Sequence, residues 1–385
     1  MAKVAFVSIM WHSRFVEELG VEYLTAVLRK ETNHEVRIFY KFPEDNYNDF
    51  FQQVIGFNPD IVGISLSHKY TGLEPLYAGA SLLKEKLPEV YLCIGGIFAS
   101  TNAENIMRKI QEVDCVFLGE SENIIVDFVD KVINHQSIDA LDGVVYRCEN
   151  GTLKTIPKKN FIMDLDAIPF PARDYMEEDW FKNDPFKMVN LMGSRGCHGH
   201  CHFCNVPSMY AVYGTEHCWR GRSIANIVDE MEYLYKEHGV LIFSFNDSSF
   251  EDAMPLTEGK KRLATFANEI LKRGLRILWT CCFRAETFKN NKEDIELIEL
   301  MVKSGLYNLL IGVEAGNKRA LNNFSKRATI SDNYQSIEIF DRYPVYISKG
   351  FIMFTPQSTP SLLRDNLELN KIAARWPAKA VTQFF

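Results

Sequence analysis

The most informative segment of this 385-residue sequence is Ser194-Arg195-Gly196-Cys197-His198-Gly199-His200-Cys201-His202-Phe203-Cys204. It follows a predicted strand at 188–193, and its three cysteines have C-x3-C-x2-C spacing. Soft thiolates select zinc, copper(I) or iron–sulfur clusters. A structural zinc ion needs a fourth ligand, which one of the three neighbouring histidines could supply. The segment alone leaves three alternatives open: a Cys3His zinc site, cysteines without metal, and a four-iron cluster held by three cysteines.

Strands and helices alternate on the C-terminal side of this segment. Apolar runs bounded by turn residues predict six strands, at 188–193, 241–246, 276–282, 307–313, 345–354 and 380–384. Helices are expected between them, including 224–237, 260–273 and 361–375. Six βα repeats are fewer than the eight of a closed barrel. We therefore expect a partial (β/α)6 barrel over residues 187–385.

The N-terminal part shows the same alternation in a separate block. Strands are predicted at 4–9, 35–40, 60–66, 90–94 and 113–118, and helices at 20–30, 76–87 and 122–134. Short loops between such elements predict a doubly wound, Rossmann-like parallel sheet over residues 1–139, which binds ligands at the carboxyl ends of its strands. Residues 140–186 are expected to be a connector with a small hairpin around Asn150-Gly151. The expected fold class is α/β.

Composition excludes several classes of protein. The sequence is 46% hydrophobic and 24% charged, as in a globular protein. Its 43 basic and 50 acidic residues give a net charge of −7, which argues against a general nucleic-acid binder. There is no apolar run of about 18 residues and no signal-peptide pattern, and nine cysteines do not indicate a disulfide framework. We expect a cytoplasmic protein without membrane or nucleic-acid partners.

The cysteine segment resembles that of the radical S-adenosylmethionine superfamily. Cys197, Cys201 and Cys204 match its C-x3-C-x2-C motif, Phe203 matches the aromatic residue before the last cysteine, and the segment ends the first strand of a six-fold βα domain. The resemblance implies a 4Fe-4S cluster whose fourth iron binds S-adenosylmethionine, and reductive cleavage to a 5′-deoxyadenosyl radical. Cofactors carry such chemistry, so no catalytic side chain is assigned.

Three further residues match positions that contact S-adenosylmethionine in this superfamily. By resemblance, Asp247 would bind the amino group, Arg284 the carboxylate, and Glu314 the ribose. Each lies at the end of a predicted strand, and an arginine fork suits a carboxylate. Phe203 completes this expected set.

The N-terminal block resembles the cobalamin-binding domain that precedes some radical S-adenosylmethionine cores. Matching positions imply a cobalamin site with seven residues: Ser65, Ser67, Gly95, Gly96, Phe98, Gly119 and Glu120. The Asp-x-His-x-x-Gly motif that supplies a cobalt-ligating histidine is missing from the first loop, although His12 lies there. A domain that has lost its cofactor is the alternative.

These resemblances imply a cobalamin-dependent radical S-adenosylmethionine enzyme, similar to the class B methyltransferases. It would methylate an unactivated carbon or phosphorus of a small molecule or peptide, using methylcobalamin and an external electron donor of the flavodoxin or ferredoxin type. One alternative is a cyclase or rearrangement enzyme with the same cofactors. A zinc-containing binding protein is a more remote one.

Overall fold

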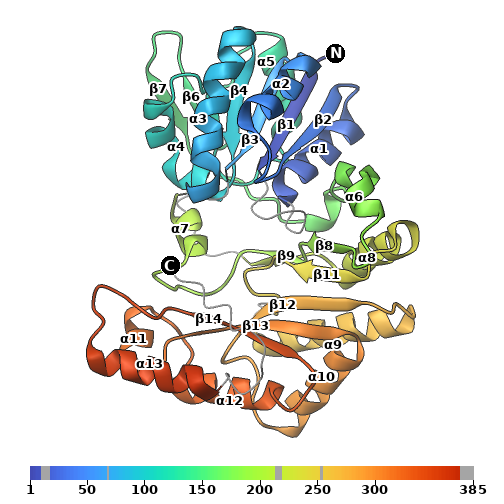
Figure 1. The fold of residues 1–385 in the computed structure, drawn as a ribbon, viewed down its shortest axis with the longest axis vertical. Coiled ribbons are helices and arrows are strands. Elements are labelled where there is room, and N and C mark those ends of the chain that lie inside the picture. Colours follow the sequence, from blue (N-terminus) through green and yellow to red (C-terminus); the bar gives the residue numbers. More distant parts are fainter. Residues whose placement is uncertain (10–17, 67–68, 213–218, 252–254, 373–385) are drawn as a thin grey trace. The chain divides into compact units, whose positions relative to one another are not determined.

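The chain forms two compact units in the computed structural model, which describes residues 1–9, 18–66, 69–212, 219–251 and 255–372. One unit comprises Met1–Asp184 with Ser208–Glu216, and the other Pro185–Pro207 with His217–Phe385. Both are built from parallel strands and helices (Figure 1), which confirms the predicted α/β fold class. Ser67, His12 and the expected strand at 380–384 lie outside the described residues, as does Cys218, a cysteine outside the C-x3-C-x2-C motif.

The first unit contains a seven-stranded sheet of order β2-β1-β3-β4-β5-β6-β7. Its strands are β1 (Lys3–Ile9), β2 (Glu35–Lys41), β3 (Ile61–Ser65), β4 (Tyr91–Gly95), β5 (Cys115–Phe117), β6 (Val144–Arg147) and β7 (Leu153–Ile156). The first five are parallel and coincide with the five predicted strands. In the order 2-1-3-4-5 the direction of winding reverses between β1 and β3, and ligands bind at the carboxyl ends beside such a switch point.

Helices connect the parallel strands of this sheet. They are α1 (Leu19–Glu31), α2 (Tyr47–Phe57), α3 (Lys69–Lys86), α4 (Ile97–Lys109) and α5 (Ile125–Ile133). Helix α3 begins seven residues before the predicted start at residue 76. Pro75 lies in its early turns and lacks a backbone N–H, a feature that normally marks the end or beginning of a helix.

The hairpin of residues 140–160 belongs to the first sheet. Strand β6 pairs antiparallel with both β5 and β7, so the hairpin extends the sheet by two strands. The segment that follows contains η1 (Leu165–Ala167), η2 (Asp174–Glu177) and α6 (Asp179–Lys182), and it packs on α1. There Ala172 donates its N–H to the Glu22 carbonyl, and Arg29 forms an ion pair with Asp174 at 2.6 Å. The compact unit therefore extends to Asp184, beyond the expected end of the Rossmann-like domain at residue 139.

The second unit contains a five-stranded parallel sheet of order β14-β13-β12-β11-β8. Its strands are β8 (Met188–Leu191), β11 (Ile242–Phe245), β12 (Leu278–Arg284), β13 (Leu306–Glu314) and β14 (Tyr346–Phe351). They coincide with the first five of the six predicted strands. The helices of this unit are α8 (Ile224–His238), α9 (Leu256–Lys272), α10 (Lys292–Lys303), α11 (Lys318–Asn323), α12 (Ile330–Phe340) and α13 (Pro360–Ile372). Helix α7 (Asn205–Val212) is divided, because Asn205–Pro207 belong to this unit and the residues from Ser208 on to the first. A two-residue antiparallel bridge joins β9 (Ser194–Arg195) to β10 (Arg220–Gly221).

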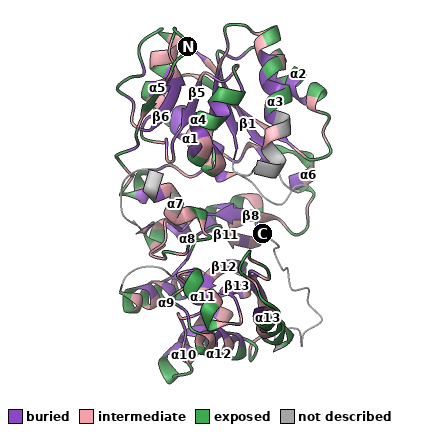
Figure 2. Cartoon of the chain, turned by 90° about the vertical axis from the view of Figure 1, so that its left-hand side faces the viewer, coloured by how far each residue is buried: buried purple, intermediate pink, exposed green. Residues whose placement is uncertain are grey.

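Burial alternates along the strands of the second sheet. On β12, Trp279, Cys281 and Phe283 are buried, whereas the residues between them are half-exposed. Trp279 packs edge-on against Phe266 of α9, with ring centroids 5.2 Å apart. One face of the sheet is therefore closed by helices, and the other, which we call the inner face, is partly open. Figure 2 shows the buried residues concentrated along the strands.

None of the helices in the described parts of the chain has the length and apolar character needed to span a membrane.

Two glycines that follow helices offer a matched test of this packing. Gly305, after α10, has φ +107°, and an added Cβ would lie 2.1 Å from the Ile277 carbonyl oxygen. Gly274, after α9, has φ +67° with open space around it. We expect Gly274→Ala to cost about 1 kcal/mol for the left-handed backbone alone. Gly305→Ala should cost clearly more, above about 2 kcal/mol. Urea unfolding of both variants checks this, and equal costs would contradict it.

Candidate functional site

The cysteine segment forms a half-buried loop between β9 and α7. Gly199 donates its N–H to the Cys197 sulfur at 3.2 Å, and a Cβ built on Gly199 would lie 3.2 Å from the Cys197 sulfur and 3.8 Å from the Cys201 sulfur. Cys204 donates its N–H to the Cys201 carbonyl at 3.1 Å. Burial raises the pKa of the Cys201 and Cys204 thiols, and the positive charge of Lys326 opposes this at Cys201. The loop thus carries three half-buried thiols, and the positive charge of Lys326 favours the thiolate form of Cys201 and Cys204.

The turn after α11 holds this loop through His202. The His202 N–H donates to the Phe324 carbonyl at 3.0 Å, and its ring nitrogens face the Asn323 carbonyl oxygen at 3.0 Å and the Ser325 hydroxyl at 2.9 Å. Phe203 packs edge-on against Phe324 with centroids 5.4 Å apart. Both ring nitrogens of His202 therefore have partners away from the thiols. In the described parts of the chain, no three Cys, His, Asp or Glu side chains are gathered to hold a metal ion. His202 therefore fixes the loop and is not available as a fourth ligand for a zinc ion.

Buried polar side chains form hydrogen bonds to Gly193 and Ser194, the residues that precede the cysteine loop. Asp247, 2% exposed, accepts hydrogen bonds from the Gly193 N–H at 2.8 Å and from the Ser194 hydroxyl at 2.7 Å. The Gly193 carbonyl accepts from the Arg222 N–H at 2.9 Å and from the Arg262 guanidinium at 3.1 Å. We call these contacts the root clamp. Burial raises the Asp247 pKa to about 6, despite the hydrogen bonds that oppose this.

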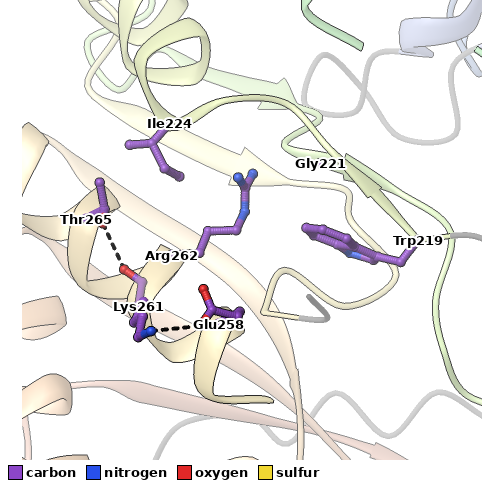
Figure 3. A pocket seen from close by; sticks show the side chains of 7 residues that line it. All are labelled: Trp219, Gly221, Ile224, Glu258, Lys261, Arg262 and Thr265. Carbon is purple, nitrogen blue, oxygen red and sulfur yellow. Dashed lines mark hydrogen bonds and ion pairs between the residues drawn. The ribbon is translucent and has the colours of Figure 1, made fainter. Parts of the chain in front are cut away.

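Further contacts lock the two arginines of the root clamp in place. The Arg222 guanidinium donates to the Met192 carbonyl at 3.0 Å and forms a fully buried ion pair with Glu230 at 2.6 Å. Arg262 also donates to the Arg222 carbonyl at 2.6 Å, and its guanidinium lies 5.5 Å from the Trp219 ring centroid. Arg262 and Trp219 line the surface pocket of Figure 3, together with Gly221, Ile224, Glu258, Lys261 and Thr265.

Arg284 ends β12 and is positioned by a buried carboxylate. Its N–H donates to Glu251 at 2.9 Å, and its Nε lies 3.8 Å from Glu251 and 3.7 Å from Glu286. Glu251 is fully buried and also accepts hydrogen bonds from Thr287 and Ser249. The guanidinium is therefore held at the carboxyl end of the sheet, on the strand where the sequence placed it.

Glu314 lies at the same end of the sheet, in a left-handed conformation with φ +60°. Its carboxylate forms a buried ion pair with Lys326 at 3.0 Å. Burial raises the Glu314 pKa, and Lys326 opposes that shift. Arg284 of β12 pairs in register with Gly312 of β13, which pairs with Gly350 of β14. The two glycines have no side chain, so Arg284 carries the only side chain among these three paired residues. The space beside Gly312 is instead taken by the ion pair, because a Cβ built there would lie 2.8 Å from the Glu314 carboxylate and 2.9 Å from the Lys326 ammonium.

In the first unit, the expected cobalamin residues gather at the carboxyl ends of β3, β4 and β5. Ser65 pairs in register with Gly95, and its hydroxyl donates to the Glu18 carboxylate. The Gly119 N–H donates to Ser100 of α4 at 2.8 Å. Phe98 is half-buried in the first turn of α4, and Glu120 accepts from the Ile162 N–H at 3.4 Å.

Gly95 and Gly96 differ in their surroundings. A Cβ on Gly95 would meet no atom within 4 Å. Gly96 has φ +105°, and a Cβ there would lie 2.7 Å from the Leu66 carbonyl oxygen. Gly95 therefore borders open space at the edge where ligands bind, whereas Gly96 is required by the backbone itself.

Family models match both units. A B12-binding domain model matches residues 14–129, and a radical S-adenosylmethionine superfamily model matches residues 191–369. The chain belongs to the cobalamin-dependent radical S-adenosylmethionine enzymes. This family membership confirms the predicted enzyme class and the predicted cofactors, namely a 4Fe-4S cluster, S-adenosylmethionine and cobalamin.

Relatives of this radical S-adenosylmethionine enzyme include two curated proteins. An uncharacterized methyltransferase of Pyrococcus horikoshii is 28% identical over 342 residues, which are 89% of this chain and 70% of that protein. The anaerobic magnesium-protoporphyrin IX monomethyl ester cyclase of Rubrivivax gelatinosus is 25% identical over 392 residues, which are 97% of this chain and 66% of that protein. The chain thus spans about two thirds of these relatives.

Among solved structures, this chain resembles the cobalamin-dependent S-adenosylmethionine radical enzyme OxsB with aqua-cobalamin and S-adenosylmethionine bound. The TM-score is 0.79 at 20% identity, over 96% of this chain and 52% of OxsB. This likeness supports the fold.

The sequence did not predict the residues that position the cysteine loop and Arg284 through buried hydrogen bonds and ion pairs. Glu251, Arg222, Glu230 and Arg262 are charged residues in polar stretches, with no spacing signal that separates them from surface charges. Only Asp247 was singled out, and the structure gives both of its carboxylate oxygens partners within the root clamp. We infer that Asp247 positions the cysteine loop, and that Arg284 is the better candidate for contact with S-adenosylmethionine.

The first prediction from this geometry concerns Asp247→Asn. The amide oxygen can still accept from the Gly193 N–H, but the Ser194 hydroxyl loses its charged acceptor, and a hydrogen bond to a charged group contributes about 1.5–3 kcal/mol. We expect less iron per chain after anaerobic reconstitution, with S-adenosylmethionine affinity of the cluster-loaded fraction within about threefold of wild type. Asp229→Asn, on the exposed side of α8, is the matched control. Full iron content with a tenfold or greater loss of affinity would instead assign Asp247 to the amino group.

The second prediction concerns the two glycines of the first unit. Gly95→Val should weaken cobalamin binding, measured by absorbance titration, with little change in melting temperature because its side chain enters open space. Gly96→Val should lower the free energy of unfolding by about 1–3 kcal/mol or more, because of its backbone conformation and the Leu66 contact. Gly56→Val, on α2 with no atom within 4 Å, controls for the substitution. Unchanged cobalamin affinity in Gly95→Val would remove this edge from the site.

Proposed function

We propose that this chain transfers a methyl group to an unactivated carbon, or to phosphorus, of a small molecule or peptide. When bound, the cluster and S-adenosylmethionine supply a 5′-deoxyadenosyl radical, and methylcobalamin supplies the methyl group. The observation that carries the proposal is the half-buried cysteine loop, fixed by the root clamp in a chain that also contains a B12-binding domain. The methyltransferase name of the Pyrococcus relative supports methyl transfer.

The residues of the second unit would divide the work as follows. Cys197, Cys201 and Cys204 would hold the cluster, and Arg284 would bind the carboxylate of S-adenosylmethionine through its two-pronged guanidinium. Glu314 would approach the ribose with its charge balanced by Lys326. Phe203, 41% exposed, would cover one side of the bound molecule while it packs on Phe324.

Cobalamin would bind at the carboxyl edge of the first sheet. The expected residues there are Ser65, Gly95, Gly96, Phe98, Gly119 and Glu120, and Ser67 remains part of the proposal. The pairing of Ser65 with Glu18 gives this edge a polar group beside the open space at Gly95. We propose that no protein histidine binds the cobalt, with His12 as the residue to test if one does.

A cyclase or rearrangement enzyme with the same cofactors is the second candidate, favoured by the Rubrivivax relative. In either case the chain would take one electron at a time from a flavodoxin- or ferredoxin-type protein in the cytoplasm.

The experiment uses enzyme reconstituted without oxygen with iron, sulfide, hydroxocobalamin, S-adenosylmethionine and a one-electron reductant. Release of 5′-deoxyadenosine reports reductive cleavage, and release of S-adenosylhomocysteine reports donation of the methyl group. We expect both products from wild type and neither from Cys204→Ala. Cys148→Ala, a cysteine of the first unit, should retain both. Formation of 5′-deoxyadenosine alone would favour the cyclase alternative, and one zinc with no iron per chain would contradict both candidates.

A further inference from the structure

A row of polar side chains crosses the second sheet from one edge to the other. Asn190 of β8 pairs in register with Ser244 of β11, Ser244 with Thr280 of β12, Thr280 with Asn308 of β13, and Asn308 with Tyr346 of β14. Every strand of the sheet thus contributes one residue at the same level. We call these five residues the polar row.

The polar row lies on the inner face. The residues just before Ser244 and Thr280 are Phe243 and Trp279, which are fully buried, and Trp279 packs on α9. Successive side chains of a strand point to opposite faces, so the two hydroxyls point away from the helices. Ser244, Thr280, Asn308 and Tyr346 are half-exposed, while Asn190 is 3% exposed. The row therefore borders the open side of the sheet.

An irregularity in β13 brings Asn308 into the row. Trp279 lies opposite Leu306, but Thr280 lies opposite Asn308, so the pairing passes over Tyr307. Such a bulge changes the direction in which the following side chains point. Here it places an amide, instead of a phenol ring, beside Thr280.

The polar row carries hydrogen-bonding capacity without formal charge. The Ser244 and Thr280 hydroxyls make no hydrogen bond to any other described residue, and Asn308 accepts one from Ser348 at 3.4 Å. Burial raises the pKa of the neighbouring Cys282 thiol to about 12, so this thiol is neutral. Lys349 of β14 points to the other face, where its ammonium binds Asn370 at 2.9 Å.

Arg284 and Glu314, the charged residues described above, lie at the carboxyl end of the sheet. Arg284 is four residues beyond Thr280 on the same strand, a rise of about 13 Å. An anion at the row would lose part of its hydration without gaining Arg284 as a partner, which is unfavourable. A hydrocarbon there would leave the Ser244 and Thr280 hydroxyls without partners, which is also unfavourable.

We propose that the polar row binds a neutral group of the substrate that carries hydroxyls or amides. This inference rests on the proposed function, because the row lies on the sheet that ends at the cysteine loop and Arg284. A substrate anchored at the row and reacting near that end would be elongated, with its reacting atom about 13 Å from the anchor. The polar row would thus select substrates that carry a neutral polar group, and it would fix how far along the sheet the substrate binds.

The test measures binding of four probes to the reconstituted holoenzyme by saturation-transfer NMR. They form two matched pairs, N-acetylglycinamide with N-acetylglycine, and methyl glucoside with glucose 6-phosphate. We expect at least one neutral member to bind more tightly than its anionic partner, and the pair concerned distinguishes an amide from a polyol. Thr280→Val and Ser244→Ala should each weaken that binding about 2- to 13-fold. Thr155→Val, on the exposed hairpin of the first unit, should not change it.

Three outcomes would overturn the proposal: no binding of either neutral probe, equal or tighter binding of the anions, or unchanged affinity in both row variants. Because neither hydroxyl holds the fold together, the melting temperatures of both variants should match wild type, and a fall of several degrees would assign the row a structural role. Iron content and release of the two S-adenosylmethionine products are measured on the same samples. If iron content and product release match wild type but neither neutral probe binds, the polar row is rejected as a binding site and the proposed function stands.

Discussion

The peptide groups of Met192 and Gly193 are hydrogen-bonded by side chains and backbone from three other segments of the second unit. Asp247 comes from the loop after β11, Arg222 from the turn between β10 and α8, and Arg262 from α9. A strand end is normally free to move, because its last groups have no ladder partner. Here Asp247, Arg222 and Arg262 fix the end of the strand through hydrogen bonds, and the cysteine loop begins directly after it. Removing Glu230 would leave the buried Arg222 charge without its ion-pair partner, so the position of Arg222 depends on Glu230.

This arrangement explains why the sequence predicted the strands and the cysteine loop but not their support. The predicted strands are short apolar runs with turn residues between them, and the cysteines stand at a fixed local spacing. Both signals are local in sequence. The root clamp joins residues 193 and 262, which are 69 positions apart, and its charged residues look like surface residues until the fold brings them together. The same holds for Glu251, whose role depends on the backbone N–H of Arg284.

Two other features were predictable only in part. The pair Gly95-Gly96 stood out as a place for close approach, yet only the position of the Leu66 carbonyl shows that Gly96 serves the backbone and Gly95 faces open space. Strand β13 was predicted at 307–313, but its register with β12 was not. A single passed-over residue, Tyr307, decides which side chains reach the inner face. The periodicity of a sequence identifies a strand, but the register of its pairing decides which side chains lie on each face of the sheet.

The hairpin that extends the first sheet also affects how this unit meets other proteins. An uncovered sheet edge is a template for pairing with another chain, and charged side chains are a common defence. Strand β7 is the edge on one side, with exposed Lys154 ion-paired to Asp139 at 2.8 Å. Strand β2 is the edge on the other, and it carries Glu35 and Arg37 side by side on exposed positions. Strands β1 and β3 to β6 are all enclosed between these charged borders, so their apolar runs are kept from acting as seeds for aggregation.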